Sequence, residues 1–346
     1  MRHVLYLIAT DEAGYGPKLG PLIIAATLWR VPGDSTSQTD LDKQFAPLRN
    51  PISVHGKNYQ IDDSKKIYRS SSGVESLECL VGAGLRWCGL SRQDLSKLIE
   101  SVSPDDVSDI KTTPWLTPWA DSTASRITPP TFPPPTTHTA ANHSGDGSST
   151  DSVNAEIETA LQQYWSKNGL TLVDVKMRMI TARRFNQICS GGFNKSDLLS
   201  RYTINLIANL NESIKDQEKV AVFCDRHGGR KFYAGPLQHR FENSLVRVVS
   251  ETKQESCYQF EDHGRQLNVR FTVKGDRFPP VAYSSIFAKY LRERMMERLN
   301  DYFSSRSDEK IRPTAGYPVD ASRFLNQIAP IRMKENIDDA NLIRNC

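Results

Sequence analysis

The acidic residues most able to do chemistry follow apolar stretches of the chain. Three such stretches each end in an aspartate: Val4–Thr10 before Asp11 and Glu12, Val220–Cys224 before Asp225, and Val269–Val273 before Lys274, Gly275 and Asp276. Carboxylates gathered in one cleft repel unless cations neutralise them, and all-oxygen ligation suits Mg²⁺ or Mn²⁺. A two-metal phosphoryl-transfer site is one interpretation. From these residues alone, a structural interpretation explains the aspartates equally well: aspartate favours turns and is therefore common at strand ends.

The elements that must position these acids alternate between strands and helices. Expected strands cover Val4–Thr10, Leu22–Trp29, 172–181, 219–224, 245–252 and 268–273. Expected helices cover 74–87, 154–169, 194–211 and Pro280–Phe303. This order predicts a mixed α/β domain, in which functional groups gather at the carboxyl ends of strands.

One stretch departs from this pattern. Residues 103–152 are dominated by Pro, Thr and Ser and show no periodicity, which is typical of a segment that cannot form a packed core. We expect a long, flexible, disordered insertion there. Its tryptophans, Trp115 and Trp119, are expected to make incidental contacts with the domain surface rather than a docking site.

Composition narrows the class of protein further. The 346 residues carry a formal net charge of +4, which permits a polyanionic partner without requiring one. The six cysteines include no CxxC pair, which disfavours a structural zinc site and a disulfide framework and indicates a reducing, cytoplasmic location. The apolar run at 4–9 is too short to span a membrane and lacks a signal-peptide cleavage site.

Several ordered segments resemble the type 2 ribonuclease H family (ribonuclease HII). The segments that carry the resemblance are TDEAGYGPKLGP at 10–21, DDSKK at 62–66, NKSDLLSRYTINLIANL at 194–210, FCDRHGG at 223–229, VKGDRFPPVAYSSIFAKYLRERMM at 273–296 and GYPVDASRFLNQI at 316–328. They cover most of the chain outside the insertion.

The resemblance implies roles for individual residues. Asp11, Glu12, Asp225 and Asp276 match the four metal-binding, catalytic carboxylates of that family. Gly14, Tyr15 and Gly16 match a loop whose backbone approaches the scissile ribose, and Tyr317 matches a tyrosine beside the ribonucleotide. Lys65, Lys274 and Lys289 are expected to contact phosphates, although ion pairs within the protein explain them equally well. Without the resemblance, Tyr317 would be taken for a packing anchor.

The chain also departs from the family pattern. Tyr15 stands where the family has arginine, which exchanges a fixed positive charge for a phenol. Thr314 and Ala315 replace a His-Lys pair, and the family's basic C-terminal segment has no counterpart in 331–346. Glu293 replaces aspartate, a mild change if that acid pairs along its helix. The distance between Asp225 and Asp276 leaves room for an extra strand pair around 244–273.

These features together predict a ribonuclease H-like mixed sheet flanked by helices. Residues 1–102 and 153–303 form its two parts, 103–152 the flexible insertion, and 304–346 a C-terminal helical segment that completes the substrate face. The expected activity is Mg²⁺- or Mn²⁺-dependent hydrolysis of RNA in RNA–DNA hybrids, or of ribonucleotides embedded in duplex DNA, by a cytoplasmic monomer without membrane contact. The alternatives are a nucleic-acid-binding protein with weak or lost catalysis, and a nuclease with another duplex or branched substrate.

Overall fold

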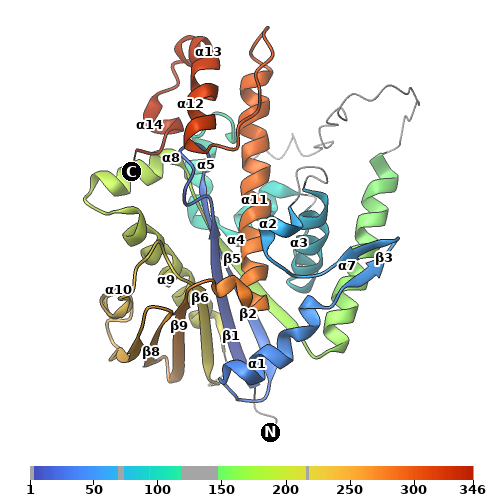
Figure 1. Ribbon diagram of the computed structural model, residues 1–346, viewed down its shortest axis with the longest axis vertical. Coiled ribbons are helices and arrows are strands. Elements are labelled where there is room, and N and C mark those ends of the chain that lie inside the picture. The colour runs from blue at the N-terminus through green and yellow to red at the C-terminus, as the bar shows by residue number, and fades with distance from the viewer. Residues whose placement is uncertain (1–3, 69–73, 93, 118–146, 216–217, 346) are drawn as a thin grey trace.

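A single large sheet organises the molecule. The computed structural model describes residues 4–68, 74–92, 94–117, 147–215 and 218–345 (Figure 1). Its sheet has seven strands in the order β5-β2-β1-β6-β9-β8-β7. The strands are β1 (Val4–Ala13), β2 (Leu22–Pro32), β5 (Thr171–Ile180), β6 (Val220–Asp225), β7 (Arg247–Glu251), β8 (Glu255–Asp262) and β9 (Arg265–Thr272). A separate hairpin pairs β3 (Ile52–Val54) with β4 (Lys57–Tyr59).

The sheet is mixed, as predicted. Strand β1 runs antiparallel to β2 and parallel to β6, and β6 runs parallel to β9. All six predicted strands are present. An extra strand pair was expected around 244–273, but β8, which lies in this region, was not predicted as a strand of its own. Tyr258 and Phe260, which alternate with polar residues in β8, face the core and are the signal that identifies it.

Helices cover both faces of the sheet (Figure 1). One face carries α11 (Pro279–Ser304), α3 (Glu75–Trp87) and α7 (Gly147–Lys167); the other carries α9 (Lys195–Ser213) and α10 (Ala234–Arg240). The remaining helices are α1 (Gln38–Phe45), η1 (Ala46–Arg49), α2 (Ser64–Ile67), α4 (Leu95–Val102), η2 (Pro104–Asp106), α5 (Val107–Lys111), α8 (Ala182–Ser190), η3 (Gly275–Arg277), α12 (Pro318–Gln327), α13 (Ala329–Lys334) and α14 (Asp339–Leu342). The predicted mixed sheet flanked by helices is therefore confirmed.

Small residues let the helices pack closely. The hydroxyl of Ser284 in α11 donates to the Ala9 carbonyl in β1 at 2.9 Å, which holds the helix against the centre of the sheet. A Cβ on Gly84 of α3 would lie 2.5 Å from the Tyr283 Oη, and one on Gly82 would lie 2.1 Å from Glu158 Oε1. These two glycines, which weaken helix propensity, are the places where α3 meets its neighbours.

The first part of the segment expected to be a flexible insertion is folded. Residues 103–117 fold as η2, α5 and the turn after it. Trp115 is 5% exposed and packs on Tyr302 and Phe303 of α11, with ring centroids 6.3 and 6.2 Å apart. The expectation of incidental surface contacts is wrong for this tryptophan, because an apolar surface on α11 takes up its ring. Trp119 and the stretch 118–146 lie outside the described residues.

The C-terminal segment is helical, as expected for 304–346, and α12, α13 and α14 gather at one end of the sheet near α8 (Figure 1). Among the residues that the structure describes, no helix has the length and apolar character needed to cross a membrane.

Candidate functional site

The sheet register brings the first two aspartates together. Strands β1 and β6 are parallel, and Thr10 pairs with Cys224 at their carboxyl ends. Asp11 and Asp225 each follow by one residue, so they occupy neighbouring positions at the same edge of the sheet. The Asp11 side chain is buried and the Asp225 side chain is partly buried.

The third aspartate arrives on a short 3-10 helix, η3. Lys274, in the left-handed conformation with φ 58°, turns the chain from β9 into η3. The Gly275 backbone N–H then donates to Asp225 Oδ1 at 2.7 Å, and a Cβ on Gly275 would lie 3.0 Å from the Asp225 Cα. Glycine therefore suits this tight contact, and Asp276 follows close enough for its charge to raise the pKa of Asp225.

The acids raise one another's pKa values. Burial, followed by the charges of Glu12 and Asp225, raises the pKa of Asp11 well above its ordinary value. Burial and the charge of Asp225 raise the pKa of Glu12 to about 8. Burial and the charge of Asp276 raise the pKa of Asp225, against the lowering effect of the Gly275 N–H and the more distant Lys65 ammonium. The site is an acidic cluster whose negative charge the protein itself neutralises only in part.

The carboxylates nevertheless do not form a finished cage. Strand alternation starts the Asp11 and Glu12 side chains on opposite faces of β1, yet their carboxyl groups come within hydrogen-bonding reach of each other, and the Ser285 side chain hydrogen-bonds Asp11. Within the described part of the chain, no group of three or more His, Cys, Asp and Glu side chains has a geometry that would hold a metal ion as it stands.

The loop after β1 is shaped by its glycines. Gly14 has φ 91°, and a Cβ there would lie 2.5 Å from Arg292 Nε and 2.6 Å from the Pro21 carbonyl oxygen. Gly16 is exposed, and a Cβ added to it would meet no atom within 4 Å, so its backbone is open to a ligand.

Tyr15 is half-buried between two loops. A Cβ on Gly228, in the loop after β6, would lie 2.2 Å from the Tyr15 Oη, so the ring rests on that glycine. Burial and the charge of Glu12 raise the pKa of the phenol, and the Arg230 guanidinium opposes this. Tyr15 therefore stands between the acidic cluster and a cation that a different loop supplies.

The three predicted lysines have different surroundings. Lys65 is exposed in α2 and acts on Asp225 electrostatically, so it lies at the acidic cluster. Lys274 is exposed two residues before Asp276. Lys289 instead forms an ion pair with Glu293 and lies 4.3 Å from the centroid of the Tyr68 ring. Lys289 is therefore in an ion pair within the protein, which was the alternative to a phosphate contact. Its partner Glu293 lies one turn further along the same helix.

Tyr317 is exposed rather than packed. Its side chain is 56% exposed at the start of α12, so its description as a packing anchor is wrong. The preceding Gly316 carbonyl accepts hydrogen bonds from the backbone N–H groups of Lys18 at 2.7 Å and Leu19 at 3.2 Å. Tyr317 is thus tied to the same loop that carries Tyr15.

Sequence reasoning missed two buried arginines beside this loop. Arg292 and Arg344 are 3% exposed, and both donate to carbonyl oxygens of the loop. Arg292 lies in the motif at 273–296, but nothing in the sequence distinguishes it from the other arginines of α11. Arg344 lies in 331–346, where we found no counterpart of the family's basic C-terminal segment. Only the tertiary structure shows where its side chain points.

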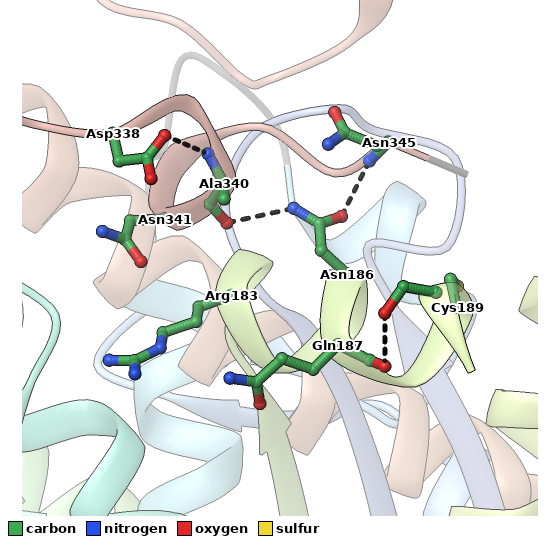
Figure 2. Close-up of a pocket in the computed structure, with 9 residues that line it drawn as sticks. Arg183, Asn186, Gln187, Cys189, Asp338, Ala340, Asn341 and Asn345 are labelled. Carbon is green, nitrogen blue, oxygen red and sulfur yellow. Dashed lines mark hydrogen bonds between the residues drawn. The ribbon is translucent and has the colours of Figure 1, made fainter.

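A cavity lined by α8 and the C-terminal segment includes none of the four acids in its wall. Figure 2 shows a cavity of about 750 Å³ between α8 and the C-terminal segment, lined by polar side chains that include Arg183, Asn186, Gln187 and Asn341. It contains none of the residues that the sequence indicated for the active site.

Comparison with known proteins yields structural likeness only. No family model and no curated protein matches the chain. Among solved structures, ribonuclease HII of Archaeoglobus fulgidus, in a complex with PCNA, is 13% identical with a TM-score of 0.39, over 97% of this chain and 92% of that chain. Ribonuclease H2 of Pyrococcus horikoshii OT3 gives the same values. Bst-RNase HIII in complex with Mn²⁺ is 12% identical with a TM-score of 0.41, over 98% of this chain and 66% of that chain.

Proposed function

We propose that this protein is a metal-dependent endonuclease of the ribonuclease H type, which hydrolyses RNA in RNA–DNA hybrids or ribonucleotides embedded in duplex DNA. The observation that carries the proposal is the register of β1 and β6, which puts Asp11 and Asp225 side by side; Glu12 follows Asp11 on β1, and η3 brings Asp276 to the same cluster. The motif resemblance in 10–21 and 273–296 supplies the class of substrate.

The chemistry of the donor set fits a hard divalent cation. Every donor is a carboxyl group, and burial together with neighbouring carboxylates raises the pKa values of Asp11, Glu12 and Asp225, so ionising them together favours a bound cation. Such a cluster favours Mg²⁺ or Mn²⁺ over softer metals. Because the described residues contain no ready-made metal group, these side chains must move before several of them share one ion.

Asp11, Glu12, Asp225 and Asp276 would hold the metal ions, which when bound activate water and stabilise charge on the scissile phosphate. Water adds to phosphorus, the bond to the 3′-oxygen breaks, and the products end in a 3′-hydroxyl and a 5′-phosphate. The chain itself orients the substrate: the backbone at Gly14 and Gly16, with Tyr15 and Tyr317, lies beside the ribose, and Lys65 and Lys274 lie beside phosphates. Ion pairing gives Lys289 at most an indirect part in this contact.

The proposed partner is a hybrid or ribonucleotide-containing duplex, bound by a monomer in the cytoplasm. The cytoplasmic location is supported by the sequence, whose six cysteines include no CxxC pair.

A second candidate is a nucleic-acid-binding protein of the same fold with weak catalysis. Two observations favour it: no ready-made metal group in the described residues, and Tyr15 in place of the family's arginine. A nuclease for another duplex or branched substrate is the third.

A substrate panel separates these candidates. All-DNA, RNA–DNA hybrid, single-ribonucleotide and branched DNA duplexes are incubated with the protein and Mg²⁺, Mn²⁺ or EDTA. The proposal predicts metal-dependent cleavage confined to the ribose-containing duplexes. Binding of the hybrid without cleavage identifies the second candidate, and cleavage of all-DNA or branched duplexes identifies the third.

A further inference from the structure

The loop that follows β1, residues 14–21, is held from behind by the C-terminal segment. Leu19 forms a β-bridge with Ile343, and the Arg344 backbone N–H donates to the Lys18 carbonyl at 2.9 Å. The Arg344 guanidinium turns into the protein and donates through Nη2 to the Pro17 carbonyl. Segments more than 300 residues apart in sequence therefore lie side by side (Figure 1).

A second arginine reaches the loop from α11. Arg292 Nη2 donates to the Ala315 carbonyl at 3.0 Å and to the Leu19 carbonyl at 3.4 Å. The Arg292 and Arg344 guanidiniums are close enough that the charge of Arg292, after burial, contributes to lowering the pKa of Arg344, to about 9. Arg344 still carries its charge at neutral pH; the Pro17 carbonyl is the hydrogen-bond acceptor of its Nη2, while its Nε and Nη1 have no hydrogen-bond partner among the described residues.

The C-terminal segment is in turn anchored to the rim of the large cavity. Asn186 of α8 donates through Nδ2 to the carbonyls of Ala340 at 3.0 Å and Ile343 at 2.7 Å, and its Oδ1 accepts from the Asn345 N–H at 2.9 Å (Figure 2). One asparagine side chain therefore fixes the backbone on both sides of Arg344.

We infer that Arg344 is a positioning residue, which Asn186 holds in place so that its guanidinium fixes the Pro17 carbonyl while its backbone N–H fixes the Lys18 carbonyl of the 14–21 loop. The other side of this loop carries Tyr15 toward Glu12. Freeing the Pro17 carbonyl would let the loop move relative to the acids, which sit on β1, β6 and η3. The effect on cleavage rests on the proposed function; the effect on the loop does not.

The test compares Arg344→Met and Arg344→Lys with Arg183→Met. Arg183 is an exposed arginine of the same cavity wall and serves as the matched control. Hydrogen exchange, read by mass spectrometry, should be at least about tenfold faster for peptides covering 14–21 in Arg344→Met and unchanged in β7–β9. In hybrid cleavage, KM should rise about tenfold while kcat changes less than about threefold. Arg344→Lys keeps the charge but not the forked set of N–H donors, so its exchange rate and KM should lie between those of the wild type and Arg344→Met.

Unchanged exchange in 14–21 overturns the inference, and so does a fall in kcat with KM unchanged. If Arg344→Met does not fold, Asn186→Ala releases the same segment while the guanidinium remains, and it must show the same faster exchange. If the wild-type protein cleaves no substrate, the proposed function fails, and the exchange data alone then support or overturn the role of Arg344 in the loop.

Discussion

At the scale of single residues, the acids at the ends of β1 and β6 oppose folding when no metal is bound. Asp11→Asn removes one charge from a buried cluster while keeping the shape and hydrogen-bonding capacity of the side chain. We expect the metal-free variant to be more stable by about 1 kcal/mol or more, as measured by urea unfolding in EDTA. A less stable variant would show that Asp11 has a compensating partner in the fold.

The Glu12 carboxyl predicts how stability depends on pH. Its pKa rises from 4.5 to about 8 on folding, so between these values the unfolded chain loses a proton that the folded chain keeps. The free energy of unfolding of the metal-free protein must therefore fall as pH rises from about 5 to about 8, by on the order of 1 kcal/mol or more. Glu12→Gln should flatten this slope, and Mg²⁺ should oppose it in the wild type. A slope that is the same in Glu12→Gln would assign the effect to other groups.

At the scale of the elements, the loop after β1 distinguishes its two glycines. Gly14→Ala forces a left-handed backbone on alanine and pushes a Cβ against Arg292 Nε and the Pro21 carbonyl, which should cost about 2 kcal/mol of stability. Gly16→Ala meets no atom within 4 Å and has no left-handed φ, so it should change stability by less than about 0.5 kcal/mol. Thermal unfolding of both variants measures the difference, and equal losses would contradict this account of the loop.

The packing of the segment before 118 makes a second prediction at this scale. Trp115 is buried against Tyr302 and Phe303, so Trp115→Ala should cost about 3 kcal/mol of unfolding free energy. Phe232→Ala removes a ring that is 64% exposed and should cost less than about 0.5 kcal/mol. Urea unfolding compares the two. If both variants lose little unfolding free energy, 103–117 would instead belong to the flexible insertion that the composition predicts.

At the scale of the whole molecule, sequence predicted what depends on local pattern. Period-two and helical spacing identified β1, β2, β5, β6 and α11, because each of these buries a regular apolar face. Composition gave the wrong environment for Trp115. Its neighbours in sequence are rich in Pro and Ser, and nothing in them indicates that the ring packs on Tyr302 and Phe303 of the distant helix α11.

The candidate site divides in the same way. Asp11 and Asp225 could be predicted together, because strand ends meet where parallel strands pair. Arg344 could not, because its contact with the Pro17 carbonyl depends on how the C-terminal segment returns to the loop. Strand β1 continues to Ala13, three residues beyond the strand that the sequence predicted, so Asp11 and Glu12 lie within the strand rather than in the turn after it.

The central proposal is that the acidic cluster is a metal-dependent catalytic centre. The most direct test of this role is the initial rate of RNA–DNA hybrid cleavage by the wild type and by Asp225→Asn across a range of Mn²⁺ concentrations. Asparagine keeps an oxygen for the Gly275 N–H, so the fold is preserved while one ligand charge is lost. We predict a rate that rises with Mn²⁺ in the wild type and is at least about a hundredfold lower in the folded variant at every concentration. Equal rates in the two proteins, or cleavage that persists in EDTA, would contradict a metal-dependent role for the cluster.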